Sequence, residues 1–140
     1  MMDFKFKTTR KIKRIAEQFN VTQKKAEAAL KKTNRKAALF IWKEAKKRTP
    51  KRRGDLEASG SITPTGPALK HMIMFDTDYA RKVHEWNDDH GLGPISRKKQ
   101  ARMNVKVGYK YLQRANDENK KEIVKLVKDN LRRLLGGNSN

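Results

Sequence analysis

The side chains that could perform acid–base or metal chemistry gather in the middle of the 140-residue chain. Five carboxylates and all three histidines lie there: Asp76, Asp78, Glu85, Asp88 and Asp89, with His71, His84 and His90. Two carboxylates can act as acid and base or bind a cation, but this spacing places no two of them on one substrate. The histidines lack the HxH and HExxH spacings that bring two imidazoles to one zinc ion. We interpret the cluster as a solvated acidic face and expect neither a metal nor a cofactor.

The candidate nucleophiles and phosphate-binding loops give weaker signals still. Ser59 and Ser61 lack the GxSxG surroundings in which α/β-hydrolases expose their serine. Gly54, Gly60 and Gly66 do not form a phosphate-cradling loop followed by a lysine. The chain has no cysteine, which excludes thiol catalysis, disulfides and cysteine-bound zinc. The sequence therefore predicts a protein that is not an enzyme.

Positive charge is the strongest chemical feature of the chain. It has 35 lysines and arginines against 15 aspartates and glutamates, a formal net charge of +20. Residues 1–53 hold 19 basic and 4 acidic side chains, so +15 of that excess lies in this part alone. Such a field favours polyanions as partners. Few aromatic residues are interleaved with the basic clusters, so we expect contact with phosphates and not with bases.

A long helix should present most of these basic side chains. Apolar residues recur with helical spacing over residues 11–19 and again over residues 22–48. Thr22 is placed to cap the second helix, and Pro50 should end it, because the residue before a proline is pushed out of helical geometry. The side chains of this helix that we expect to face phosphates are Lys24, Lys25, Lys31, Lys32, Arg35, Lys36, Lys46, Lys47 and Arg48.

A β-hairpin is predicted after Gly54. In DLEASGSI, apolar and polar residues alternate with the period of two that is typical of a strand. The turn residues of TPTGP and the apolar run ALKHMIMF then provide a second, antiparallel arm. Four apolar side chains should be buried in this hairpin, which should pack on the helix that contains Phe40 and Ile41: Leu56, Ile62, Ile73 and Phe75.

The remaining segments complete a predicted α+β domain. We expect a short helix over YARKVHEW, a mobile loop over residues 87–104, a short strand at VKVGY and a last helix over residues 111–135. Residues 1–8 and 136–140 should be flexible ends. No apolar run approaches the ~20 residues of a membrane span, so we expect a soluble protein without a membrane partner. The order predicts one domain over residues 1–140, with long N-terminal and C-terminal helices packed on a small antiparallel β-sheet.

An alternative function is indicated by residues 15–30, IAEQFNVTQKKAEAAL. They are similar to a helix-turn-helix, with Ala16 inside the first helix, Val21 after the turn and a polar second helix. The chain would then be a basic DNA-binding regulator or packaging protein. Two features disagree with this interpretation: Asn20 stands where glycine is usual, and the second helix runs far beyond an ordinary recognition helix.

Three segments, in order, resemble one family of phage proteins. Residues 49–62, TPKRRGDLEASGSI, resemble the TP-x-x-x-G-x-L-x-x-S pattern of tail-completion and minor capsid proteins, which join head to tail in long-tailed bacteriophages. YARKVHEW resembles the same family's YA-x-x-V-x-E segment, and GYKYLQRANDE resembles the start of its last helix. The matching positions are Thr49, Pro50, Gly54, Leu56, Ser59, Tyr79, Ala80, Val83, Glu85, Leu112 and Ala115.

The resemblance implies a structural role in the virion. Such a subunit assembles in the host cytoplasm with copies of itself into a ring, six-fold by family pattern, in the neck between head and tail. It joins the phage connector or adaptor to the tail tube or tail terminator around the path of the genome. This chain departs from the family in the insertion-like stretch 87–104 and in its strong positive charge. A basic helix facing the lumen of such a ring would contact genomic DNA without base specificity.

Overall fold

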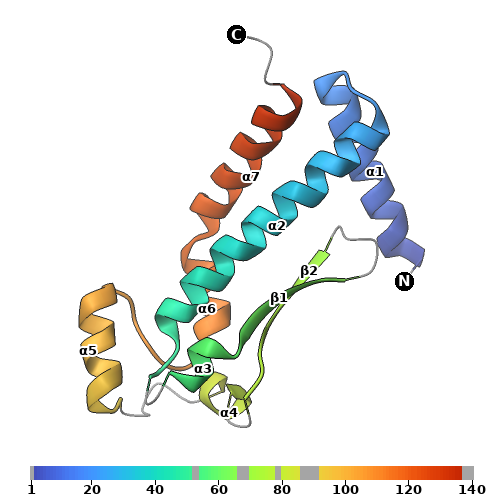
Figure 1. The fold of residues 1–140 in the computed structure, drawn as a ribbon. Coiled ribbons are helices and arrows are strands. Elements are labelled where there is room, and N and C mark those ends of the chain that lie inside the picture. The colour runs from blue at the N-terminus through green and yellow to red at the C-terminus, as the bar shows by residue number, and fades with distance from the viewer. Residues whose placement is uncertain (1, 52–53, 66–69, 78–79, 86–91, 137–140) are drawn as a thin grey trace.

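The computed structural model describes residues 2–51, 54–65, 70–77, 80–85 and 92–136. One long helix, α2 (Gln23–Arg48), runs through the middle of the molecule (Figure 1). It contacts α1, both strands of a hairpin, and the helices α5, α6 and α7. The predicted α+β fold, with helices packed on a small antiparallel sheet, is confirmed. No helix of the described residues is both long and apolar enough to cross a membrane.

The helical pair at the N-terminus is joined by a tight turn. Helix α1 (Met2–Phe19) is longer than predicted, so the expectation that residues 1–8 form a flexible end is wrong from residue 2 onward. Asn20 adopts a left-handed conformation with φ 53°, its N–H donates to Glu17 O, and the Val21 N–H donates to Ala16 O at 2.9 Å. This is a Schellman motif, in which asparagine replaces the usual glycine. The Lys25 N–H donates to Thr22 Oγ1 at 3.1 Å, which confirms Thr22 as the cap of α2.

The hairpin starts later than predicted. Residues 55–58 form a short helix, α3 (Asp55–Ala58), so Leu56 lies in a helical turn and not in a strand. Strand β1 (Gly60–Thr65) pairs antiparallel with β2 (Lys70–Phe75), with Gly60 opposite Phe75 and Ile62 opposite Ile73. Both strands contact α2, as expected. Of the four side chains predicted to be buried, Leu56 is buried, whereas Ile62, Ile73 and Phe75 are only half-buried.

The C-terminal half contains more helix than predicted. Helix α4 (Ala80–His84) is where the sequence placed a short helix. The expectation of a mobile loop over residues 87–104 is wrong for residues 94–103, which form α5 (Pro94–Met103); residues 87–91 lie outside the described part. No strand forms at 105–109. The predicted last helix is divided at Asn119 into α6 (Tyr111–Glu118) and α7 (Lys120–Leu135). Of the predicted flexible end, residues 136–140, only Gly136 belongs to the described residues.

Small side chains dominate the interior. Seven of the twelve buried apolar residues in the described part are alanine, and five of these seven lie on α1 and α2. The larger buried side chains gather beside the hairpin, where Leu56, Val83 and Tyr111 are buried together with Ala80. The Phe75 ring meets the Tyr111 ring edge-on, with centroids 5.3 Å apart. The fold thus places its bulkiest core at the end of α2 where the chain leaves the helix.

Candidate functional site

The three phage-like segments meet at this end of α2, although they are far apart in the sequence. Leu56 comes from the first segment, Ala80 and Val83 from the second, and Leu112 from the third. Leu56 and Val83 are 1% and 2% exposed, and Leu112 packs against the cluster. The Tyr111 hydroxyl donates to Ala80 O at 3.2 Å, and burial raises the pKa of Tyr111 to about 12. Four of the matching positions, at least one from each segment, therefore meet in one cluster.

Most of the other matching positions also have an identifiable physical role. Gly54 has φ +85°, a conformation that favours glycine, and it starts the turn into α3. The Ser59 hydroxyl donates to Leu56 O at 2.8 Å and closes α3 before the hairpin. Ala115 is fully buried, which allows α6 to lie close to α2. Tyr79 lies outside the described residues.

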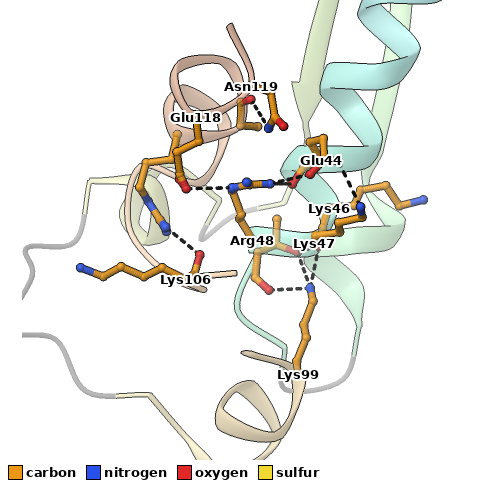
Figure 2. A network of polar contacts seen from close by, with 11 residues as sticks. Glu44, Lys46, Lys47, Arg48, Lys99, Lys106, Glu118 and Asn119 are labelled. Atoms are coloured by element: carbon orange, nitrogen blue, oxygen red, sulfur yellow. Dashed lines mark hydrogen bonds and ion pairs between the residues drawn. The ribbon is translucent and has the colours of Figure 1, made fainter. Parts of the chain in front are cut away.

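The last turn of α2 is capped by a buried lysine from α5 (Figure 2). The Lys99 ammonium is 2% exposed and donates to Lys46 O at 2.6 Å, to Thr49 O at 2.7 Å and to Thr49 Oγ1 at 3.0 Å. It also forms an ion pair with Glu57 on α3. Helix C-termini leave carbonyls without intrahelical partners and carry partial negative charge, so a cation satisfies both needs there. Thr49 and Pro50 thus end α2, and the carbonyl oxygens left without intrahelical partners accept hydrogen bonds from Lys99.

Desolvation lowers the pKa of Lys99, and the hydrogen bond that Lys99 donates to Glu57 opposes that shift. A buried lysine of this kind can serve as a nucleophile when its amine is free. Here every ammonium proton is directed at an acceptor of α2, Thr49 or α3. Lys99 therefore acts as a clamp that links α2, α3 and α5, and its ammonium has no free donor for a substrate.

A second cation, Arg48, lies beside this clamp inside the molecule. Its guanidinium donates to Glu44 O at 2.8 Å and to Glu44 Oε2 at 2.9 Å, and it reaches Glu118 on α6 at 3.4 Å. Burial alone would raise the pKa of Glu44, but hydrogen bonds from Arg48 and Lys47 outweigh it and hold the pKa below its ordinary value. The prediction that Arg48 faces a polyanion is wrong, because it is 4% exposed and paired with these carboxylates.

Helix α5 is attached to the same junction by further polar contacts. The Ser96 hydroxyl accepts from Lys51 N at 2.8 Å and donates to Lys51 O at 3.1 Å. The Gly108 N–H donates to Arg48 O at 2.8 Å, so the segment after α5 also pairs with the end of α2. Sequence reasoning missed Ser96 and Lys99 as part of any site. A helix start was nevertheless signalled by Pro94, since proline is favoured at the first helical position.

The remaining basic side chains of α2 divide into two groups. Lys24, Lys25, Lys32, Arg35 and Lys36 are exposed, which contact with phosphates would require. The side chains of the other group interact with neighbours on α2. Lys31 forms an ion pair with Glu27 at 3.6 Å and Lys47 with Glu44 at 3.0 Å, and the Lys46 ammonium lies 4.3 Å from the centre of the Trp42 ring. Lys43 is also exposed on α2 and was not among the predicted residues.

The hairpin has one face on α2 and one face in solvent. Ser61, Thr63, Met72 and Met74 alternate onto the outer face, and the two methionines are 48% and 44% exposed. None of these four side chains carries a charge. Exposed large apolar side chains also occur at Ile95, Met103 and Val124, but these lie singly on α5 and α7.

The carboxylates and histidines of the middle region do not assemble into a metal-binding group within the described residues. Lys110 donates to Glu85 at 2.6 Å, and this contact, aided by His84, lowers the pKa of Glu85. His84 lies edge-on to the Tyr111 ring. Asp78, Asp88, Asp89 and His90 lie outside the described part of the chain. Comparison with protein-family models, with curated proteins and with solved structures found no match, so the site is interpreted from its own geometry.

Proposed function

We propose that this chain is a structural subunit of a long-tailed bacteriophage particle, a tail-completion or neck protein without catalytic activity. Copies of it form a ring, six-fold as the resemblance implies, at the head-to-tail interface. The ring joins the connector or adaptor to the tail tube or tail terminator around the DNA path.

The observation that carries the proposal is the convergence of the three phage-like segments on one buried cluster. Leu56, Ala80, Val83 and Leu112 meet there, and Gly54 and Ser59 shape the turn that sends the chain into the hairpin. All three segments contribute a side chain to this one cluster. Their meeting supports a shared structural unit that places a hairpin relative to a long helix.

Charge indicates which surface takes the neighbouring copy. At +20, two copies repel each other over most of their surfaces. The outer face of the hairpin is uncharged at Ser61, Thr63, Met72 and Met74, and it offers two adjacent exposed methionines. A second copy can therefore approach it with little electrostatic cost and bury apolar area. We assign this face to the contact between neighbouring subunits.

The test is deletion of the gene from its phage, followed by complementation and electron microscopy of the particles. Loss of the protein should leave heads with packaged DNA that lack joined tails. Met72→Lys with Met74→Lys should fail to complement, because each neighbour would meet two additional charges. The matched control is Ile95→Lys with Met103→Lys, which adds the same charge at exposed apolar sites on α5 and should complement. Normal tailed particles from the deletion, or a single copy per particle, would overturn the proposal.

A further inference from the structure

We infer that one exposed face of α2 binds the phosphate backbone of double-stranded DNA without reading its bases. This α2 basic face is formed by Lys25, Lys32, Lys36 and Lys43, all of them exposed. Their spacings of seven, four and seven residues keep them on one side of the helix. From Lys25 to Lys43 the face extends about 27 Å, at 1.5 Å per residue, which approaches one turn of a DNA duplex, ~34 Å.

No carboxylate of the described residues forms an ion pair with Lys25, Lys32, Lys36 or Lys43. Helix α2 has only two acidic residues, Glu27 and Glu44. Glu27 pairs with Lys31, and Glu44 is turned inward to Arg48 and Lys47. The exposed Lys24 and Arg35 flank the face and have no acidic partner in the described part of the chain. Six cations along one helix are therefore available to an external anion, whereas the buried Arg48 is not.

The composition of the face favours DNA over an acidic protein. Protein interfaces are built around apolar and aromatic anchors and are depleted in lysine. None of the exposed large apolar side chains among the described residues lies on α2. Trp42, which precedes Lys43 on α2, is half-buried, and the Lys46 ammonium covers its ring at 4.3 Å from the ring centre. It is not available to stack on a base, so single-stranded binding through stacking is disfavoured as well.

This inference uses only charge and exposure, and it stands whether or not the chain forms a ring. In a ring, the α2 basic face would point toward the genome as it passes from head to tail. Non-specific contacts there would hold DNA in the channel without impeding its passage at particular sequences, because phosphate contacts carry no sequence information.

The experiment measures binding of the purified full chain to a 30-base-pair duplex of arbitrary sequence by fluorescence anisotropy, from 50 to 200 mM salt. Each phosphate neutralised contributes about −0.9 to the slope of log affinity against log salt. Six cations predict a slope of about −5, which is a loss of roughly a thousandfold in affinity over this range.

The variant that tests the face replaces Lys25, Lys32, Lys36 and Lys43 with glutamine, which has a similar helix propensity. Its slope should fall in magnitude to about −2, because four of six contacts are lost. A matched control replaces four exposed cations elsewhere with glutamine: Arg81, Lys82, Arg97 and Lys98. Both variants have a net charge of +16, four less than +20, and the control should keep the slope of the natural chain.

Three results would overturn the inference. Equal loss in both variants would show diffuse attraction to the whole molecule. Binding to poly-glutamate as tight as binding to the duplex, at equal charge, would identify an acidic protein as the partner. A preferred sequence in a footprinting assay would identify the helix-turn-helix regulator instead. Because ring formation is measured on particles and DNA binding on the purified chain, failure of one does not imply failure of the other.

Discussion

Replacing Lys99 with methionine should be among the most destabilising single changes in this chain. Methionine fills a similar volume, so the loss is confined to the ammonium and its contacts with Lys46 O, Thr49 and Glu57. Two carbonyls lose a charged donor, at about 1–3 kcal/mol each. Glu57 keeps some access to water, and the desolvation cost of Lys99 disappears, so the smaller values apply. We expect a loss of about 3 kcal/mol in the free energy of unfolding, or roughly 10 °C in Tm.

Urea unfolding followed by circular dichroism measures this loss, with Lys98→Met as the matched control. Lys98 is the exposed neighbour of Lys99, and its replacement should change stability by less than about 0.5 kcal/mol. Hydrogen exchange adds a local measurement, because the Gly108 and Lys51 amides donate to Arg48 O and Ser96 Oγ at this junction. Both amides should exchange faster in Lys99→Met. If Lys99→Met is as stable as Lys98→Met and the two amides keep their protection, the clamp does not hold α2, α3 and α5 together.

Three further predictions concern single residues of the same region. The pKa of Glu44 in the folded state is below its ordinary value of 4.5. Its contribution to stability is therefore present above pH 4.5 and is lost as the pH falls through the folded-state pKa. Glu44→Gln should reduce this loss of stability at low pH, measured by urea unfolding as a function of pH. Burial raises the pKa of Tyr111 to about 12, so the contribution of its protonated hydroxyl to stability is present below pH 10 and is lost as the pH rises toward 12. Tyr111→Phe should remove this loss at high pH. At neutral pH it should lower the free energy of unfolding by about 1 kcal/mol, measured by urea unfolding, because the hydrogen bond to Ala80 O is lost. Gly60→Ala should cost about 1–3 kcal/mol, since its Cβ would lie 2.4 Å from Trp42 Nε1 and 2.9 Å from the Phe75 ring. The cost of Gly60→Ala should shrink in a Trp42→Leu background, and equal costs in both backgrounds would contradict the close approach.

Local signals made the long helix and the hairpin predictable. Thr22 caps α2 through its own hydroxyl, Pro50 follows its last turn, and helical periodicity connects the two. The alternation of apolar residues located β2 and residues 60–62 of β1, where Ile62 lies opposite Ile73, but residues 63–65 continue β1 where a turn was predicted. It failed at Leu56, because a period of two over four residues is too short to distinguish a strand from one helical turn.

The parts that depend on distant polar partners were not predictable in the same way. Helix α5 turns Ser96 and Lys99 toward the end of α2, so its inward side is polar and hydrophobic periodicity does not reveal it. Arg48 resembles any basic residue of a last turn until Glu118, seventy residues later, is placed beside it. One local signal existed, because Glu44 stands four residues before Arg48, at the spacing of a helical ion pair.

The alanine-rich interior has a consequence for the heat capacity of the chain. Unfolding heat capacity comes mainly from apolar surface that becomes hydrated, and a typical chain of 140 residues has about 1.7–2.1 kcal/mol/K. Seven of the twelve buried apolar residues described are alanine, so the isolated subunit should fall below that range and its stability should vary little with temperature. In the proposed ring, apolar area buried between copies should give assembly a negative heat-capacity change of its own. Calorimetry would then find two heat-capacity changes, one for folding of the chain and one for assembly of the chains, where a typical monomer shows a single one for folding.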